Sequence, residues 1–334
     1  MRSSSELQEQ LFLQIKNKLD PHLSLADELA SILNMSTDSV YRRIRGEKQL
    51  DLEELYRLCT HFKISLDSVL HLQEDFFKFT GSFVQPLSFR FDQYLKLVAQ
   101  QVSYMSEFKD RKVFYLCKDI PLFHHFQFRE LAAFKHYVWM KGIFNTPEFA
   151  NKKFSLNEYP EELFQLGQKA LNIYNNIESV EIWNMESINS TIRQIEFYHE
   201  SKLFKSEEEV DLIYEALEKL LNHLELQADL GYKFNAQDNK QTPEANFQMY
   251  FNEIIIGDNS VLAILDGSRI GYIIHTVINI MMTRDLRFCD NMYETFQNIM
   301  KRSTLISSVS ERERSRFFKN LRNRINSRRQ NSKT

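Results

Sequence analysis

The sequence predicts a mainly α-helical protein with two domains. A five-helix bundle is expected at the N-terminus, followed by a larger, mostly helical α+β domain with a small antiparallel meander. Glycine and proline are scarce, 8 and 6 in 334 residues, so the chain has few obligatory breaks. Apolar residues recur at the three-to-four spacing of helices over much of the chain. An Asp266-Gly267 pair between two apolar runs is a strong hairpin signal.

The N-terminal bundle is predicted to span residues 1–72. Ser36 and Asp51 are good N-caps, because their side chains can accept a hydrogen bond from a free amide of the first helical turn. Gly46 supplies the glycine that commonly follows the last residue of a helix. After a first helix, the predicted helices of the bundle span 26–33, 37–44, 52–62 and 64–70.

A linker is predicted at 73–88, where Gly81 and Pro86 break helices. The second domain, predicted at 89–330, is expected to serve dimerisation or signal sensing. It contains two apolar seams with helical spacing, each about two heptads long. We interpret the seams as intramolecular core, with a dimer interface as the alternative. Their residues are Phe91, Leu95, Val98, Val102 and Met105 in the first seam, and Val210, Ile213, Leu217, Leu220 and Leu224 in the second.

Within the second domain, Ser206 and Glu209 have the spacing of a capping box at the start of a long helix. Farther on, three apolar runs separated by turn residues predict the antiparallel meander, with strands at 250–256, 261–265 and 270–275. The other predicted elements are a strand at 112–117 and helices at 123–144, 161–176, 187–201, 207–229, 291–301 and 310–325, and residues 322–334 are expected to fray.

The third helix of the bundle has the side chains that are most informative about function. A helix fits the major groove of B-DNA, and short polar groups at its N-terminal end can approach base edges. Arginine can donate two hydrogen bonds to guanine, and arginine or lysine can neutralise phosphates. The alternative is a solvated basic face. The candidate residues are Thr37, Asp38, Tyr41, Arg42, Arg43, Arg45 and Lys48.

Several positions in this region keep one register through three helices. They are Leu29-Ala30, Asn34-Met35-Ser36, Val40, Gly46, Leu55, Phe62-Lys63-Ile64-Ser65 and Leu70. On these residues, the segment 20–72 resembles the lambda-repressor-like, XRE-type helix-turn-helix family. The run from Val40 to Gly46 also looks like regulators of Bacteroidetes-type bacteria.

The resemblance implies a protein that binds double-stranded operator DNA with the third helix in the major groove, usually as a homodimer on a two-fold symmetric site. It implies base-reading positions at Thr37, Asp38 and Arg42, with Tyr41 as a further candidate. It also implies phosphate contacts from Arg43, Arg45 and Lys48.

Two positions depart from the family pattern. Many members have a glutamine at the start of the second helix, where this chain has Leu25-Ala26-Asp27. Members usually have an apolar residue three positions after the equivalent of Val40, often followed by a glutamate. Here those two positions are Arg43 and Ile44.

A second basic stretch lies at 311–333, where nine Arg and Lys residues stand against Glu311 and Glu313. We interpret it as a terminal helix that docks through an apolar face and keeps a solvated basic side. The alternative is an auxiliary contact to the DNA backbone. The apolar face consists of Phe317, Phe318, Leu321 and Ile325.

No arrangement of residues predicts catalysis, a cofactor or a metal site. The adjacent His124 and His125 would point to different faces of a helix, and His275 lies in an apolar run, so all three are interpreted as structural. The cysteines, Cys59, Cys117 and Cys289, are far apart, which fits thiols in a reducing compartment.

The most apolar stretch, 270–282, is too short to span a bilayer, and the N-terminus lacks the apolar segment of a signal peptide. We therefore expect a cytoplasmic, sequence-specific transcriptional regulator without enzymatic activity. Any effector is expected to bind the second domain. The alternative is a protein-interaction module that uses a helix-turn-helix fold without specific DNA binding.

Overall fold

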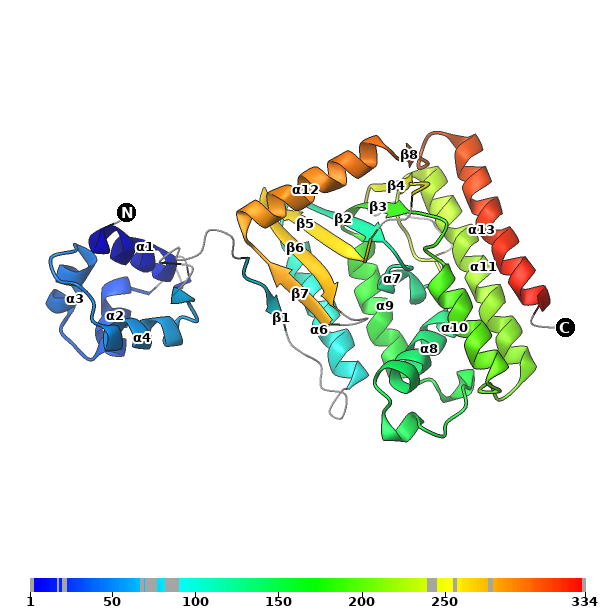
Figure 1. The fold of residues 1–334 in the computed structure, drawn as a ribbon, viewed down its shortest axis with the longest axis horizontal. Coiled ribbons are helices and arrows are strands. Elements are labelled where there is room, and N and C mark those ends of the chain that lie inside the picture. Colours follow the sequence, from blue (N-terminus) through cyan, green and yellow to red (C-terminus); the bar gives the residue numbers. More distant parts are fainter. Residues whose placement is uncertain are drawn as a thin grey trace. The chain divides into compact units, whose positions relative to one another are not determined.

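The computed structural model divides the chain into two compact units, Met1–Phe76 and Phe77–Thr334 (Figure 1). The residues that it describes are 3–16, 18–19, 23–66, 69, 77–81, 90–238, 245–254, 257–275 and 279–331.

The first unit is helical. Side chains of Ser24, Ser36 and Asp51 each accept a hydrogen bond from the third residue of the following helix, as expected for N-caps. Asn34 ends the second helix in the left-handed conformation, at φ 54°. The helices are α1 (Ser4–Lys16), α2 (Leu25–Leu33), α3 (Thr37–Ile44) and α4 (Leu52–His61). Their shared core consists of Leu11, Phe12, Ile15, Ala26, Leu29, Leu33, Val40, Leu58, Ile64 and Val69.

The prediction of a five-helix bundle is wrong for the described residues, which form four helices in this unit. The predicted fifth helix at 64–70 falls partly on residues 67, 68 and 70, which lie outside the described residues. Ile64 and Val69 are nevertheless buried in the core of the unit, so this segment packs against the four helices.

The second unit is built on a mixed sheet whose order is β1-β7-β6-β5-β2-β3-β4-β8. Strands β2, β3 and β4 are parallel to one another, and the other neighbouring pairs are antiparallel. The strands are β1 (Thr80–Gly81), β2 (Arg111–Cys117), β3 (Glu178–Trp183), β4 (Phe247–Phe251), β5 (Ser260–Leu265), β6 (Ser268–His275), β7 (Asn279–Thr283) and β8 (Thr304–Leu305).

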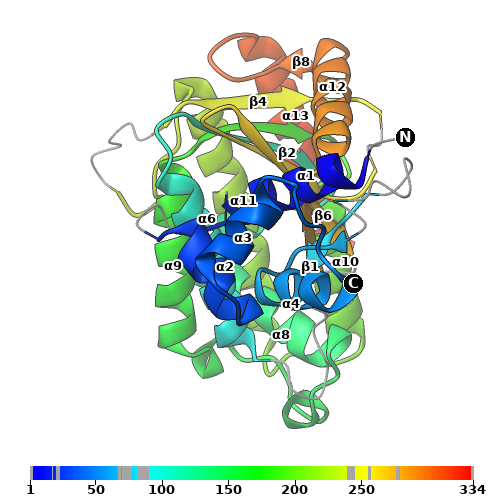
Figure 2. The ribbon, with the colours of Figure 1, turned by 90° about the vertical axis from the view of Figure 1, so that its left-hand side faces the viewer.

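Helices cover both faces of this sheet (Figures 1 and 2). Successive side chains of a strand point to opposite faces, so Phe114 and Leu116 pack with helix α12, whereas Tyr115 and Cys117 pack with the helices of the other face. The helices are α6 (Phe91–Ser106), α7 (Leu122–His125), α8 (Arg129–Val138), the π-helix Trp139–Ile143, 3₁₀ turns at Pro147–Phe149 and Leu156–Glu158, α9 (Glu161–Asn175), α10 (Asn189–Glu200), α11 (Glu207–Leu230), α12 (Leu286–Lys301) and α13 (Glu311–Asn331).

The predicted small meander is wrong in its size and in one of its pairings. Strands β5 and β6 form the expected hairpin, with Asp266 and Gly267 both at positive φ in its turn. Strand β4, predicted as the first meander strand, pairs instead with β3 in parallel and with β8. The connection through Gly257 is therefore a crossover between strands that β2 and β3 separate, rather than a hairpin loop.

Other predicted boundaries also change. The predicted linker at 73–88 includes β1, which pairs with β7 and so belongs to the sheet. The predicted helix at 123–144 is divided into α7, α8 and a π-helix. Ser206 occupies the N-cap position of α11, but within the described residues its side chain accepts no capping hydrogen bond. The Glu209 carboxylate accepts from the Leu156 amide, at 2.8 Å, rather than from the Ser206 amide. The segment predicted to fray from 322 continues α13 to Asn331.

The interpretation of the two apolar seams as core is confirmed. Every seam residue is buried within the second unit, the first seam in α6 and the second in α11. Their apolar faces are consequently covered by the unit itself, and the alternative of a dimer interface along them is wrong.

Three histidines of the second unit make its stability sensitive to acid. Burial lowers the pKa of His125 to about 3 and the pKa values of His136 and His223 to about 4. All three are therefore neutral in the folded protein at pH 5, whereas in the unfolded chain they bind protons below about pH 6.5.

We predict that the free energy of unfolding falls as pH decreases from about 6.5 to about 4, by about 1.4 kcal/mol per pH unit for each buried histidine. Denaturant titrations at pH 7 and pH 5, followed by tryptophan fluorescence, measure this change, because both tryptophans, Trp139 and Trp183, lie in the second unit. The variant His136→Phe should have a shallower dependence. Equal stability at the two pH values would contradict the prediction.

Candidate functional site

The solvent-facing side of α3 brings together most of the residues predicted to contact DNA. Thr37, Asp38, Tyr41, Arg42 and Arg45 are all exposed, at the spacing of one helical face. Lys48 is exposed in the turn just beyond. The side chains of Arg42 and Arg45 are each 55% exposed, so both guanidinium groups are accessible to a ligand.

Arg43 does not lie on this face, so its predicted phosphate contact is wrong. The residue is 4% exposed, and its Nε donates a hydrogen bond of 2.9 Å to Glu54, with a second one from its terminal nitrogen to the same carboxylate. It also donates to the Ser39 carbonyl at 3.1 Å. Arg43 lies three residues after buried Val40, and thus on the inner side of α3.

The position of α3 is also held by helix α1. Buried Gln8 donates through Nε2 to the carbonyls of Arg43 and Lys48, at 2.6 and 2.9 Å, and accepts from the Leu50 amide at 2.8 Å. Gly46 has φ +75°, and a Cβ there would lie 2.4 Å from the Ser5 hydroxyl. Helix α1 therefore packs directly against the turn that follows α3, and only glycine fits that approach without strain.

A carboxylate that was not among the predicted site residues lies beside the exposed arginines. Glu47 accepts two hydrogen bonds from Arg45, at 2.7 and 3.3 Å, and its other close cation is Arg42, at 3.7 Å. The hydrogen bond from Arg45 holds the pKa of the Glu47 carboxyl below its usual range, so the group is ionised at neutral pH. The pairing follows from the tight turn at Gly46, which returns residue 47 toward the end of the helix.

The first unit is acidic apart from this region. Residues 1–76 contain nine Lys and Arg residues against thirteen Asp and Glu residues, so their formal net charge is −4. Attraction to a nucleic acid would therefore have to come from the local cluster of Arg42, Arg45 and Lys48 rather than from the charge of the whole unit.

The first unit also exposes apolar side chains on α4. Leu52 and Tyr56 lie one turn apart on α4 and are 83% and 70% exposed. A groove of about 630 Å³ beside α1 has mixed polar and apolar walls. Its lining residues are Glu6, Glu9, Gln10, Phe12, Leu13, Lys16, Leu25 and Ile44.

The basic helix α13 docks through its apolar face, as predicted. Its apolar residues Phe317, Phe318, Leu321 and Ile325 are fully buried. Most of its arginines form ion pairs with carboxylates of the same unit, which argues against the alternative of a DNA-backbone contact. The pairs are Arg314 with Asp229, Arg322 with Glu225, Arg324 with Glu186, Arg328 with Glu196, and Arg329 with Asp211 and Glu215.

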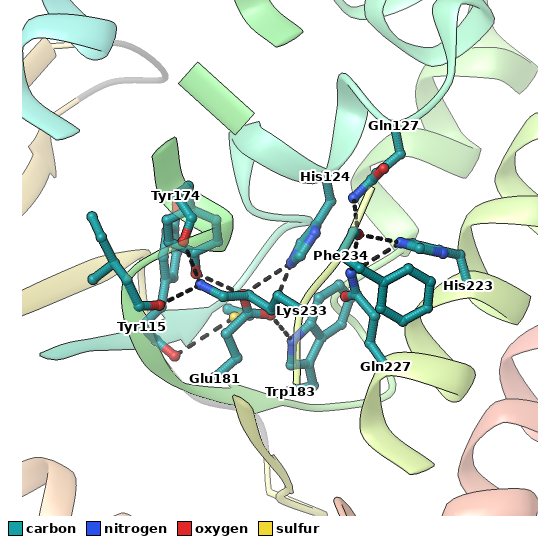
Figure 3. Close-up of polar contacts among 12 residues, drawn as sticks. Tyr115, His124, Gln127, Tyr174, Glu181, Trp183, His223, Gln227, Lys233 and Phe234 are labelled. Atoms are coloured by element: carbon teal, nitrogen blue, oxygen red, sulfur yellow. Dashed lines mark hydrogen bonds and ion pairs between the residues drawn. The ribbon is translucent and has the colours of Figure 1, made fainter. Parts of the chain in front are cut away.

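The second unit contains a buried carboxylate on its central strand, Glu181 of β3, whose side chain points to the α9 face of the sheet (Figure 3). It accepts hydrogen bonds from His124 Nε2 at 2.9 Å, from the Tyr174 hydroxyl at 2.7 Å and from the Trp183 indole at 2.8 Å. Three donors thus converge on its two oxygens. His124, predicted as structural, has this role.

A buried cation lies beside Tyr174. Lys233 is fully buried, and its Nζ donates to the carbonyls of Tyr174, in the last turn of α9, and of Ile177, just beyond it, at 2.6 and 2.7 Å. The same ammonium lies 3.7 Å from the centre of the Tyr174 ring. A cation at a helix C-terminus is favourable, because the free carbonyls there carry partial negative charge.

Both buried charges are surrounded by protein groups, so we interpret this cluster as structural rather than as a ligand site. It joins α7, α9, β3 and the segment after α11. Among the described residues, no group of three His, Cys, Asp or Glu side chains could hold a metal ion. No helix in the described part of the chain is long and apolar enough to cross a membrane.

Comparison with protein-family models, curated proteins and solved structures finds no match for the chain. The helix-turn-helix resemblance consequently rests on the residues of the chain alone.

The first prediction for this site concerns Gln8. Substitution Gln8→Ala leaves two carbonyls and an amide without their buried side-chain partner, at a cost of about 1–3 kcal/mol. Hydrogen–deuterium exchange should therefore become faster in peptides covering residues 40–50. The variant Gln14→Ala, on the same helix and outside this set of contacts, is the control. Unchanged exchange in Gln8→Ala would show that α1 does not hold the turn.

The second prediction concerns Glu181. Substitution Glu181→Ala removes the acceptor of three buried donors, each of which costs about 1–3 kcal/mol when unsatisfied, so we expect a loss of several kcal/mol. Glu178→Ala on the same strand removes a partly exposed pair with Lys112, 2.7 Å long, and should cost less than about 1 kcal/mol. Denaturant unfolding followed by tryptophan fluorescence compares the two variants. Equal losses would refute the structural role of Glu181.

Proposed function

We propose that this chain is a sequence-specific DNA-binding regulator of transcription, in which α3 enters the major groove. The observation that supports this proposal most directly is the single exposed face of α3, on which Thr37, Asp38, Tyr41, Arg42 and Arg45 lie together. The element has the form of a helix-turn-helix, since α2 and α3 are joined by a tight turn at Asn34.

The order of side chains along α3 favours a division of labour. Thr37, Asp38, Tyr41 and Arg42 occupy the N-terminal half and the middle of the helix, the part that contacts base edges in this type of docking. Arg45 and Lys48 lie at and beyond its C-terminus, where phosphate contacts fit better. Arg42 suits guanine, while the Asp38 carboxylate suits the exocyclic amino group of cytosine.

We further propose that the protein binds as a homodimer on a two-fold symmetric site, in the cytoplasm, and that it is not an enzyme. The second unit would then supply dimerisation or the sensing of an effector. Since both apolar seams are used internally, contacts between copies would involve other surfaces of the chain.

A second candidate function is a protein-interaction module. The exposed Leu52 and Tyr56 and the net acidic charge of the first unit favour it. The two functions differ in their dependence on salt, because binding to DNA phosphates releases counterions whereas an apolar contact does not.

The test is selection of bound duplexes from a random pool, followed by titration of the selected duplex at several salt concentrations. Arg42→Ala should weaken binding to the selected duplex by about 1–3 kcal/mol and relax the preference at one base pair. Arg45→Ala should weaken binding to every duplex and reduce the slope of log K against log salt by about 0.9. Absence of binding by the wild-type protein at low salt would favour the interaction module.

A further inference from the structure

The exposed arginines of α3 share one carboxylate in the free protein. Arg45 donates to both oxygens of Glu47, and Arg42 approaches the same group at 3.7 Å. The second carboxylate on the face, Asp38, lies one turn before Arg42, a spacing at which ion pairs often form. Within the described residues, however, the ion pair of Arg42 is with Glu47 and not with Asp38.

This arrangement has the chemistry of an arginine site for an anion. A guanidinium that binds a carboxylate with two parallel hydrogen bonds can bind a phosphate in the same way. The Glu47 side chain is 47% exposed, so solvent and ligands reach the pair. A DNA phosphate that contacts Arg45 must therefore displace the Glu47 carboxylate or accept its repulsion.

We propose that Glu47 lowers the affinity of α3 for DNA by competing with DNA phosphates for Arg42 and Arg45. This inference rests on the proposed function. On a random duplex, the arginines gain mainly phosphate contacts, and these exchange one anion for another. On a preferred duplex, Arg42 also gains hydrogen bonds to a base edge. Both arginines must leave Glu47 on either duplex, so the competition lowers the affinity for random and for preferred DNA alike.

The experiment compares Glu47→Gln with wild type in the full-length chain, by fluorescence anisotropy with a labelled random-sequence duplex and with a duplex selected by the wild-type protein. Glu47→Gln should bind the random duplex roughly twofold to fivefold more tightly, the range expected for an exposed ion pair. It should bind the selected duplex more tightly by a similar factor.

A matched control separates local competition from net charge. Glu53 is an exposed glutamate of the same unit whose ion-pair partner is Arg57, also on α4. Glu53→Gln changes the charge of the unit by the same amount without freeing an arginine of α3, so both affinities should stay near those of wild type.

Each outcome bears on one proposal. Tighter random binding by Glu47→Gln alone supports competition. Equal effects of Glu47→Gln and Glu53→Gln overturn it, because net charge then accounts for the change. Weaker binding by Glu47→Gln also overturns it, since Glu47 would then position the arginines for DNA. If wild type and the double variant Arg42→Ala/Arg45→Ala both fail to bind any duplex at low salt, the proposed function itself is wrong.

Discussion

The candidate interface depends on the buried ion pair between Arg43 and Glu54. Because successive residues of a helix are 100° apart, burying Val40 and Arg43 determines which residues of α3 face outward. Glu54 is also part of the capping box of α4, where it bonds the Asp51 amide. One carboxylate therefore satisfies a buried guanidinium, sets the rotation of α3 and marks the start of α4.

Local signals in the sequence predicted local structure well. The bounds of α3 followed from Ser36 and Gly46, and the hairpin of β5 and β6 followed from Asp266-Gly267. The eight-stranded sheet could not be predicted in the same way, because pairing between distant segments leaves little trace in short windows of sequence. Strand β3 was missed since a charged residue, Glu181, occupies a buried position in its middle.

The same contrast applies to the candidate site. The exposed residues of α3 could be identified from helical spacing. The inward position of Arg43 could not, because its charge suggested an exposed side chain. The signal was present: Arg43 stands where a family resemblance expects an apolar residue, and Glu54 supplies the opposite charge from another helix. Glu47 was missed because its contact with Arg45 depends on the geometry of the turn at Gly46.

Helix α13 also shows that positive charge alone does not indicate a binding site, since its arginines are more numerous yet mostly paired. Positive charge predicts nucleic-acid binding only where the fold leaves it accessible.

The contacts of α1 bear on how the protein can be dissected. A fragment trimmed to the two helices of the helix-turn-helix and α4 would keep every residue proposed to touch DNA. It would lose Gln8, together with the close approach of Ser5 to Gly46, and with them the support of the turn that carries Glu47 and Lys48. The smallest piece that retains the native recognition surface therefore begins at or before Ser4, where α1 starts.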